Sequence, residues 1–368
     1  MMALAAGSAL LLAMVWVGYP LVMRALARHA PHPGMAPPAV WPSVTAVVAS
    51  REPAAAILAR ADDLAAAQYS GRLDVVVALD PASEATVSEL AGRRPWLTVV
   101  RGDAPGGKAT TLNAAVRAAT GEVLVFSDTH QRFAPDAIRA LVVDLSSGPY
   151  AATSGRLELP EGREASLIDR YWRMERRLRR DEARMHSAIG VSGSIYAMWR
   201  AEWAPLPAGL ILDDLYVPMR LVLAGRRIGF TDAARATDTR RTEPAEEYRR
   251  KVRTLTGNFQ LCAWLPAALV PIRNPVWLQF VLHKLLRLLT PYLLVVLGAA
   301  ILLMLVAAFG AYVLVAGAGA LLLLGLAAAA AGKWRALRSV AAWGFSLQAA
   351  IVTATWYGLR GRWDVWRR

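Results

Sequence analysis

Cysteine is nearly absent from this chain of 368 residues, which contains Cys262 alone. One thiol cannot form an internal disulfide, and it excludes a metal cluster built on cysteines, so we expect Cys262 to be a packing residue. Zinc-finger spacing and the aromatic motif of RNA-recognition domains are also missing, so no nucleic-acid partner is expected. The net charge of +14 instead favours contact with anionic lipid headgroups or phosphorylated substrates.

Charged residues are missing from several long runs. Residues 3–23 carry no charge and are long enough to cross a bilayer. Arg24, Arg28 and His29 follow this run and no Lys or Arg precedes it, which favours a membrane anchor over a cleaved signal peptide. Further apolar runs begin at 291 and 311, and a weaker one at 340. We expect a multi-pass protein of the cell membrane, with membrane lipids among its partners and its central domain in the cytoplasm.

The runs divide the chain into segments. We expect an N-terminal transmembrane anchor (1–24), a Pro-rich linker (25–39), a soluble domain (40–270), an interfacial helix (271–290), transmembrane segments (291–359) and a basic tail (360–368). If all three C-terminal runs crossed the bilayer, the basic tail would lie outside, against the positive-inside rule. The sequence therefore leaves the number of spans open.

The soluble domain alternates short apolar runs with helical spacing. Strands are expected at 40–50, 73–80, 97–102 and 122–128, and helices at 54–69 and 108–120. This alternation predicts a doubly wound, mostly parallel α/β sheet, whose ligands bind beyond the carboxyl ends of the strands. Three of those ends carry polar residues, namely Ser50 with Arg51 and Glu52, Asp80, and Asp128.

The stretch "GDAPGGKA" (102–109) has the spacing of a phosphate-binding P-loop, G-x-x-x-x-G-K. Ala109 stands where that motif needs a hydroxyl for magnesium, and Thr110 comes one place late. A P-loop nucleotide hydrolase, a solvated Gly-Pro turn and a nucleotide-facing loop of another kind all remain open.

Six motifs in order resemble the membrane-bound family 2 glycosyltransferases, the inverting GT-A enzymes that include cellulose and hyaluronan synthases. The match covers about residues 40–290. The motifs are "VTAVVASRE" (44–52), "VVVALDPASEAT" (75–86), "GGKATTLNAAVRAATGEVLVFSD" (106–128), "GVSGSIYAMWR" (190–200), "ILDDLYVPMRLVLAGRRIGF" (211–230) and "RRKVRTLTGN" (249–258). The last three stand where the family has its acceptor loop, its E-D motif and its Q-x-x-R-W motif.

The resemblance implies an enzyme that transfers a sugar from a nucleotide-sugar donor, most often UDP-linked, to a lipid-linked or envelope saccharide. Asp214 would be the catalytic base, with Asp213 beside it. The donor would be held by Ser50, Glu52, Asp80, Lys108, Asp128 and Arg253. A divalent metal, Mn²⁺ or Mg²⁺, would neutralise the leaving diphosphate. The residues alone also allow Asp213 to be an acidic N-cap of the following helix.

Two departures from the family pattern stand out. The D-x-D motif is Asp128-Thr129-His130, so the second carboxylate is replaced by His130. Either His130 is a substituted metal ligand, or Asp128 and the diphosphate bind the metal without it. The stretch "RKVRT" keeps Arg253 but lacks the glutamine and the tryptophan of Q-x-x-R-W, which favours adding one or a few sugars over building a polymer. These departures also keep open a catalytically inactive membrane scaffold.

The arginine-rich segment 167–186 has the spacing of an amphipathic helix. It is either a solvated surface helix or a helix that rests on anionic lipid and steers a lipid-phosphate acceptor. Tyr196, Trp199, His186 and His283 are expected to be packing or interface residues.

Overall fold

The computed structural model describes residues 1–30, 36–158, 167–239, 244–330 and 334–365. Its centre is a mixed eight-stranded sheet with the order β3-β2-β1-β4-β7-β6-β8-β5. The strands are β1 (Val44–Ser50), β2 (Leu73–Leu79), β3 (Leu97–Arg101), β4 (Val123–Ser127), β5 (Gln131–Phe133), β6 (Tyr150–Glu158), β7 (Tyr196–Trp199) and β8 (Arg227–Asp238). Strands β1 to β4 pair in parallel, while β7 is antiparallel to both β4 and β6.

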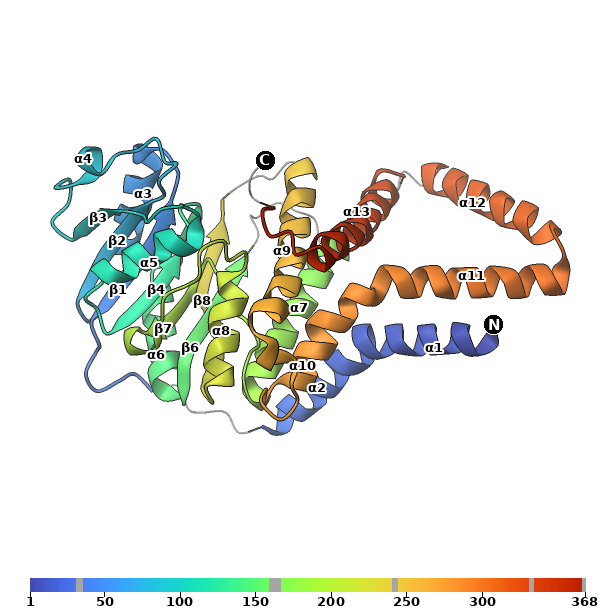
Figure 1. Ribbon diagram of the computed structural model, residues 1–368, viewed down its shortest axis with the longest axis horizontal. Coiled ribbons are helices and arrows are strands. Elements are labelled where there is room, and N and C mark those ends of the chain that lie inside the picture. The colour runs from blue at the N-terminus through green and yellow to red at the C-terminus, as the bar shows by residue number, and fades with distance from the viewer. Residues whose placement is uncertain (31–35, 159–166, 240–243, 331–333, 366–368) are drawn as a thin grey trace.

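Helices cover both faces of the sheet (Figure 1). On one face lie α3 (Ala54–Ala65) and α6 (Ala137–Ser147), and on the other lie α5 (Lys108–Ala118) and α8 (Asp213–Leu223). Successive residues of β1 enter the two cores alternately, with Val48 under α3 and Val47 under α5. This two-sided burial explains why β1, β2 and β4 are continuous apolar runs in the sequence.

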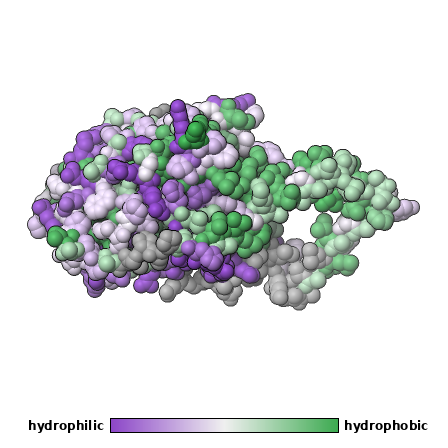
Figure 2. Space-filling model, turned by 90° about the horizontal axis from the view of Figure 1, so that it is seen from below, coloured by the Kyte–Doolittle hydropathy of each residue, from purple (hydrophilic) through white to green (hydrophobic). Residues whose placement is uncertain are grey.

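Two stretches are long and apolar enough to cross a membrane, Met2–His29 and Trp277–Phe309. The first consists of α1 (Met2–Ala13), the π-helical η1 (Met14–Gly18) and α2 (Tyr19–His29). The second consists of α10 (Trp277–Phe280), the π-helical η4 (Val281–Leu285), the 3₁₀ turn η5 (Leu286–Leu289) and α11 (Thr290–Phe309). In Figure 1, α1 and α11 project side by side from the sheet domain, and Figure 2 shows apolar surface over the projecting part.

The apolar run from 340 belongs to α13 (Trp334–Leu359), which packs along α9 (Pro244–Trp264). A Cβ on Gly358 would stand 2.4 Å from Cγ of Phe259, so the two helices approach very closely. Tyr248 and Thr353 also share a hydrogen bond of 3.0 Å. In the described part of the chain, α13 is not among the stretches apolar enough to span a membrane.

The remaining elements include three short helices, the long α7, and α12 in the projecting part (Figure 1). They are α4 (Val87–Leu90), η2 (Arg200–Glu202), η3 (Pro266–Leu269), α7 (Leu167–Met185) and α12 (Tyr312–Ala330). The expected strands and helices are present with shifted ends; for example, 40–50 is reduced to Val44–Ser50 and 54–69 to Ala54–Ala65. The expected linker 25–39 begins inside α2, and its residues 31–35 lie outside the described ones.

The arginine-rich helix α7 has a buried face of carboxylates. Glu182 accepts hydrogen bonds from Tyr19 (2.6 Å) and from Nδ1 of His283 (2.8 Å). Glu175 binds Nε2 of His283 at 3.0 Å and also pairs with Arg287. These side chains tie α2 and the segment 281–289 to the sheet domain, so the fully solvated helix and the lone packing role expected for His283 are both too simple.

Candidate active site

Asp80 and Asp128 follow the buried strands β2 and β4, which flank β1. They lie at the same edge of the sheet because the three strands run in parallel. The Asp80 carboxylate accepts hydrogen bonds from the amides of Ala82 (2.9 Å) and Gly107 (2.7 Å) and an ion pair from Arg51 (3.0 Å). Burial opposes ionisation of Asp80, but these donors outweigh it and lower its pKa. Asp80 is therefore a fixed anion that orders the loop before α5.

Those contacts also decide how the P-loop-like stretch is used. The amide of Gly107, which would face a phosphate in a P-loop, donates to Asp80 instead. Lys108 turns away from the loop and lies between two carboxylates, 3.1 Å from Asp128 and 3.4 Å from Asp213. The arrangement disfavours the P-loop alternative and makes Lys108 the link between β4 and α8.

Asp213 and Asp214 open α8, whose N-cap is Leu212, so Asp213 is a first-turn residue and not the cap. The loop 190–195 closes over them, since the amide of Val191 donates to the Asp214 carbonyl at 2.9 Å. A Cβ on Gly193 would lie 3.1 Å from Cβ of Asp214 and 3.4 Å from its Oδ2. Glycine at 193 therefore lets the backbone of this loop lie close against the Asp214 side chain.

The Asp214 carboxyl has an unusually high pKa. Burial and the neighbouring Asp213 charge raise its pKa from 3.8 to about 6, although Lys108, Lys284 and Arg253 oppose the shift. Such a carboxyl is ionised at neutral pH and is still basic enough to accept a proton, which suits a general base. Lys108 is buried, which disfavours its charge, but Asp128, Asp213 and Asp214 outweigh this and raise its pKa.

Arg253 reaches this cluster from α9. Gln260, two turns further along α9, accepts from the Ile211 amide at 2.8 Å and donates to the Gly209 carbonyl at 3.0 Å. These bonds fix α9 against the start of α8. Burial and the nearby Arg250 lower the pKa of Arg253, while the aspartates of the cluster oppose that shift, so its guanidinium faces their charge.

His130 and Asp128, the expected metal pair, have different partners. Nε2 of His130 lies 2.8 Å from Oε1 of Glu52, whereas Oδ1 of Asp128 faces Lys108. Ser50 is buried and accepts hydrogen bonds from the Glu52 amide (3.1 Å) and the Thr129 hydroxyl (2.9 Å). Within the described ranges, no three His, Cys, Asp or Glu side chains gather as a metal-ligand group.

The carboxylates nevertheless fit a cation. Asp128 and Asp213 converge on one ammonium group, which shows that their oxygens are placed to share a positive charge. Carboxylate oxygens are ligands that Mg²⁺ and Mn²⁺ accept, with diphosphate oxygens completing the coordination.

Three residues near the cluster had no site role in the sequence analysis, although Tyr196 was expected to be a packing or interface residue. Tyr196 is fully buried and stacks on Phe126 with ring centroids 4.4 Å apart. Burial, together with the charges of the three aspartates, raises its pKa well above the usual value. Arg60 is also fully buried and donates to Ser127 at 2.6 Å, directly before Asp128. Lys284 was assigned to an interfacial helix, yet its charge acts on Asp214. Only the fold brings these side chains to the sheet edge.

Residues 46–201 match the family model "Glycosyl transferase family 2". This range contains Asp80, Lys108 and Asp128 and ends before α8. This part of the chain is therefore similar to the family 2 glycosyltransferases, and the enzyme class is glycosyltransferase.

A solved structure has the same fold. The mannosyltransferase PcManGT from Pyrobaculum calidifontis, in complex with GDP-Man and Mn²⁺, is 23% identical with a TM-score of 0.70, over 97% of this chain and 99% of that chain. GalNAc-T7 with UDP, GalNAc and Mn²⁺ is 15% identical (TM-score 0.46; 61% of this chain, 48% of that chain). TarS from S. aureus with UDP-GlcNAc is 16% identical (TM-score 0.40; 59% of this chain, 66% of that chain). GalNAc-T7 and TarS are too distant to support an argument. No curated protein matched the chain.

Proposed function

We propose that this glycosyltransferase is membrane-attached and transfers a sugar, with inversion, from a nucleotide-sugar donor to a hydroxyl of a lipid-linked or envelope saccharide. The observation that carries the proposal is the Asp214 carboxyl, which is partly exposed beside the loop 190–195 and whose pKa of about 6 suits a base. Asp214 lies in the electrostatic reach of Lys108 and Arg253, two cations suited to a diphosphate.

The reaction assigns a role to each group. The acceptor oxygen attacks the anomeric carbon of the sugar while its proton passes to Asp214. The bond from that carbon to the diphosphate breaks, and the nucleoside diphosphate leaves with the electron pair toward Lys108 and Arg253. Attack opposite to the leaving group inverts the anomeric centre. Asp213 holds Lys108 in place at 3.4 Å.

The donor's nucleoside end would lie along the ends of β1 and β2, at Ser50, Glu52 and Asp80. Asp128 would hold the ribose or a divalent metal, Mn²⁺ or Mg²⁺, with His130 as a second ligand once it leaves Glu52. The metal, when bound, supplies positive charge to the leaving diphosphate. PcManGT, which shares the fold, was solved with Mn²⁺.

Membrane attachment would use α1 and α11. Arg24, Arg28 and His29 follow the first apolar stretch, and positive charge favours the cytoplasmic side, so the sheet domain would be cytoplasmic. In the space-filling view the apolar surface lies over the helices that project away from the sheet (Figure 2).

A donor panel tests the proposal. The full chain in detergent is offered UDP-, GDP- and other nucleotide sugars with Mn²⁺ or Mg²⁺, and nucleotide release is measured. A UDP-sugar is the donor expected from the sequence, and GDP-mannose is the main competitor because PcManGT binds it. His130→Ala should reduce a Mn²⁺ preference if His130 is a ligand, and Glu52→Gln is the matched variant that frees His130. ATP hydrolysis in place of sugar-dependent release would support the P-loop alternative, and donor binding without release in any arm would support the inactive scaffold.

A further inference from the structure

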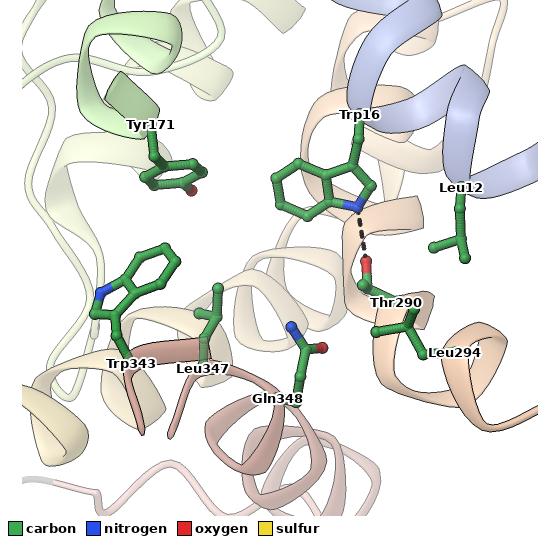
Figure 3. Close-up of a pocket in the computed structure, with 8 residues that line it drawn as sticks. All are labelled: Leu12, Trp16, Tyr171, Thr290, Leu294, Trp343, Leu347 and Gln348. Atoms are coloured by element: carbon green, nitrogen blue, oxygen red, sulfur yellow. Dashed lines mark hydrogen bonds between the residues drawn. The ribbon is translucent and has the colours of Figure 1, made fainter. Parts of the chain in front are cut away.

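Two buried features lie outside the groups that the proposed reaction uses. The first is a cavity of about 320 Å³ beside the candidate membrane spans, with Trp16 and Thr290 on one side and Tyr171 and Trp343 on the other (Figure 3). The Trp16 indole donates to the Thr290 hydroxyl at 3.1 Å, and the Tyr171 ring contacts both tryptophans. These contacts join α7 and α13 to the two spans. The second feature, Arg60, lies in the sheet domain and reaches the site.

Arg60 belongs to α3 and is fully buried, on a helix face whose other buried residues are apolar, such as Ile57 and Leu64. Moving a guanidinium out of water is strongly unfavourable unless hydrogen bonds and opposite charges compensate for the lost hydration. The contacts that Arg60 makes therefore indicate what its charge does in the fold.

The guanidinium of Arg60 has three partners. One terminal nitrogen donates to the buried Ser127 hydroxyl at 2.6 Å, and the other pairs with Asp63, three residues further along α3. The face of the guanidinium lies over the Phe133 ring, 4.4 Å from its centre. Asp63 belongs to the same helix as Arg60, whereas Ser127 and Phe133 belong to the strands β4 and β5.

The two partners on strands flank one turn. Ser127 ends β4 and Phe133 ends β5, and the turn 128–130 between these strands carries both expected metal-binding side chains. The Ser127 hydroxyl donates in turn to the carbonyl of Asp128, the first of them, at 3.0 Å. Arg60 thus holds the chain on both sides of this turn from within the core.

The shape of the arginine side chain matters for these contacts. Its planar guanidinium donates from both terminal nitrogens while its face lies on an aromatic ring, whereas lysine offers a single point charge. Methionine fills a similar volume without any charge. Because 27% of the Asp63 side chain is exposed, its carboxylate remains solvated when the arginine is removed. Arg60→Met should therefore fold, which separates the role of the charge from that of the volume.

We propose that Arg60 is a positioning residue for the sugar transfer: it fixes the turn 128–130, and with it the two side chains that would hold the metal of the donor complex. Arg60 touches neither substrate nor metal and acts through its contacts with Ser127 and Phe133. Removal of a group that orients a metal ligand typically weakens metal binding about ten- to a hundredfold. The inference rests on the proposed function, because it takes Asp128 as a residue that holds the metal.

Nucleotide binding by the full chain in detergent tests this role without relying on turnover. Calorimetry measures the affinity for UDP, and for GDP in a second arm, once with Mn²⁺ and once with EDTA. Arg60→Met should weaken binding about ten- to a hundredfold with Mn²⁺ and by less than about threefold in EDTA. Arg60→Lys should recover only part of the loss, because it keeps the charge but cannot make both contacts.

Ser127→Ala removes the acceptor on β4 and leaves Arg60 paired with Asp63. It should weaken binding with Mn²⁺ in the same direction, and the double variant should lose no more than Arg60→Met alone, because both changes break one contact. This variant also provides the test if Arg60→Met does not fold. Arg94→Met is the matched control, since Arg94 pairs with Asp62 of the same helix at 2.8 Å and is partly exposed; this change should leave both affinities as in the wild type.

Loss of binding by the same factor with Mn²⁺ and in EDTA, or a lower melting temperature with unchanged binding, would make Arg60 a structural residue and overturn the inference. Wild-type binding that Mn²⁺ does not strengthen would overturn it too. Sugar-dependent nucleotide release is measured on the same preparations. Release whose Mn²⁺ requirement is unchanged in Arg60→Met overturns this inference alone. Binding that Mn²⁺ strengthens only when Arg60 is present, without release from any donor, overturns the proposed activity alone.

Discussion

The pH dependence of turnover should follow the charges around Asp214. A base must be ionised to accept a proton, and the pKa of Asp214 is about 6. Half of the enzyme is then competent near pH 6 and only about a tenth one unit lower, so kcat should fall about tenfold per unit on the acidic side. Replacing the base itself by Asn should reduce kcat by roughly 10²- to 10⁴-fold.

Two neighbouring substitutions should move this acidic limb in opposite directions. Asp213→Asn removes the negative charge that helps to raise the pKa of Asp214, so the limb moves to lower pH. Arg253→Met removes a cation that opposes the rise, so the limb moves to higher pH. The assay is nucleotide release at saturating donor across the acidic and neutral range at constant ionic strength. A wild-type profile without an acidic limb, or a limb that stays in place in both variants, would refute the assignment.

Three further outcomes are expected. Asp214→Asn should stabilise the fold at neutral pH by at most about 3 kcal/mol, because a carboxyl with a raised pKa loses its stabilising contribution as pH rises from 3.8 through about 6. Melting curves at acidic and neutral pH check this prediction. A gain in stability that persists below pH 3.8 would contradict it. Gly193→Val should crowd the Asp214 carboxylate and lower kcat while calorimetry finds donor affinity unchanged, and unaltered turnover would show that the close approach of this loop to Asp214 does not matter for catalysis. Glu175→Gln should lower the free energy of unfolding by about 3–5 kcal/mol, since it leaves buried Arg287 and His283 with one carboxylate fewer. A melting temperature equal to that of the wild type would count against a structural role for the ion pairs of Glu175.

Much of the sheet domain can be predicted from sequence because its parallel strands are buried on both faces. That burial produces the continuous apolar runs of β1, β2 and β4, and a polar residue marks each strand end. Strands β6 to β8 have weaker signals, because β7 contains four residues and the strands alternate buried and exposed positions irregularly. Their order depends on long-range pairing, which local periodicity does not contain.

The candidate site could likewise be predicted from the sequence only in part. The acidic residues could be placed at strand and helix ends, but the bridge from Lys108 to Asp128 and Asp213 depends on how α8 meets β4. The influence of the Lys284 charge on Asp214 depends on the docking of segment 281–289 against α7. No spacing rule predicts either interaction.

The apolar runs illustrate a limit of hydropathy. The run from 340 resembles a span by composition, yet α13 lies against α9 through the close approach at Gly358 and the bond from Tyr248 to Thr353. Its apolar side chains include ones that pack against α9. Length and composition alone do not distinguish such packing from a membrane span.

The most direct test of the central claim compares the wild-type chain with Asp214→Asn in sugar transfer, with donor binding measured in parallel by calorimetry. The account predicts that Asp214→Asn binds the nucleotide sugar as the wild type does and loses transfer. Transfer by Asp214→Asn at the wild-type rate would contradict the assignment of Asp214 as the base.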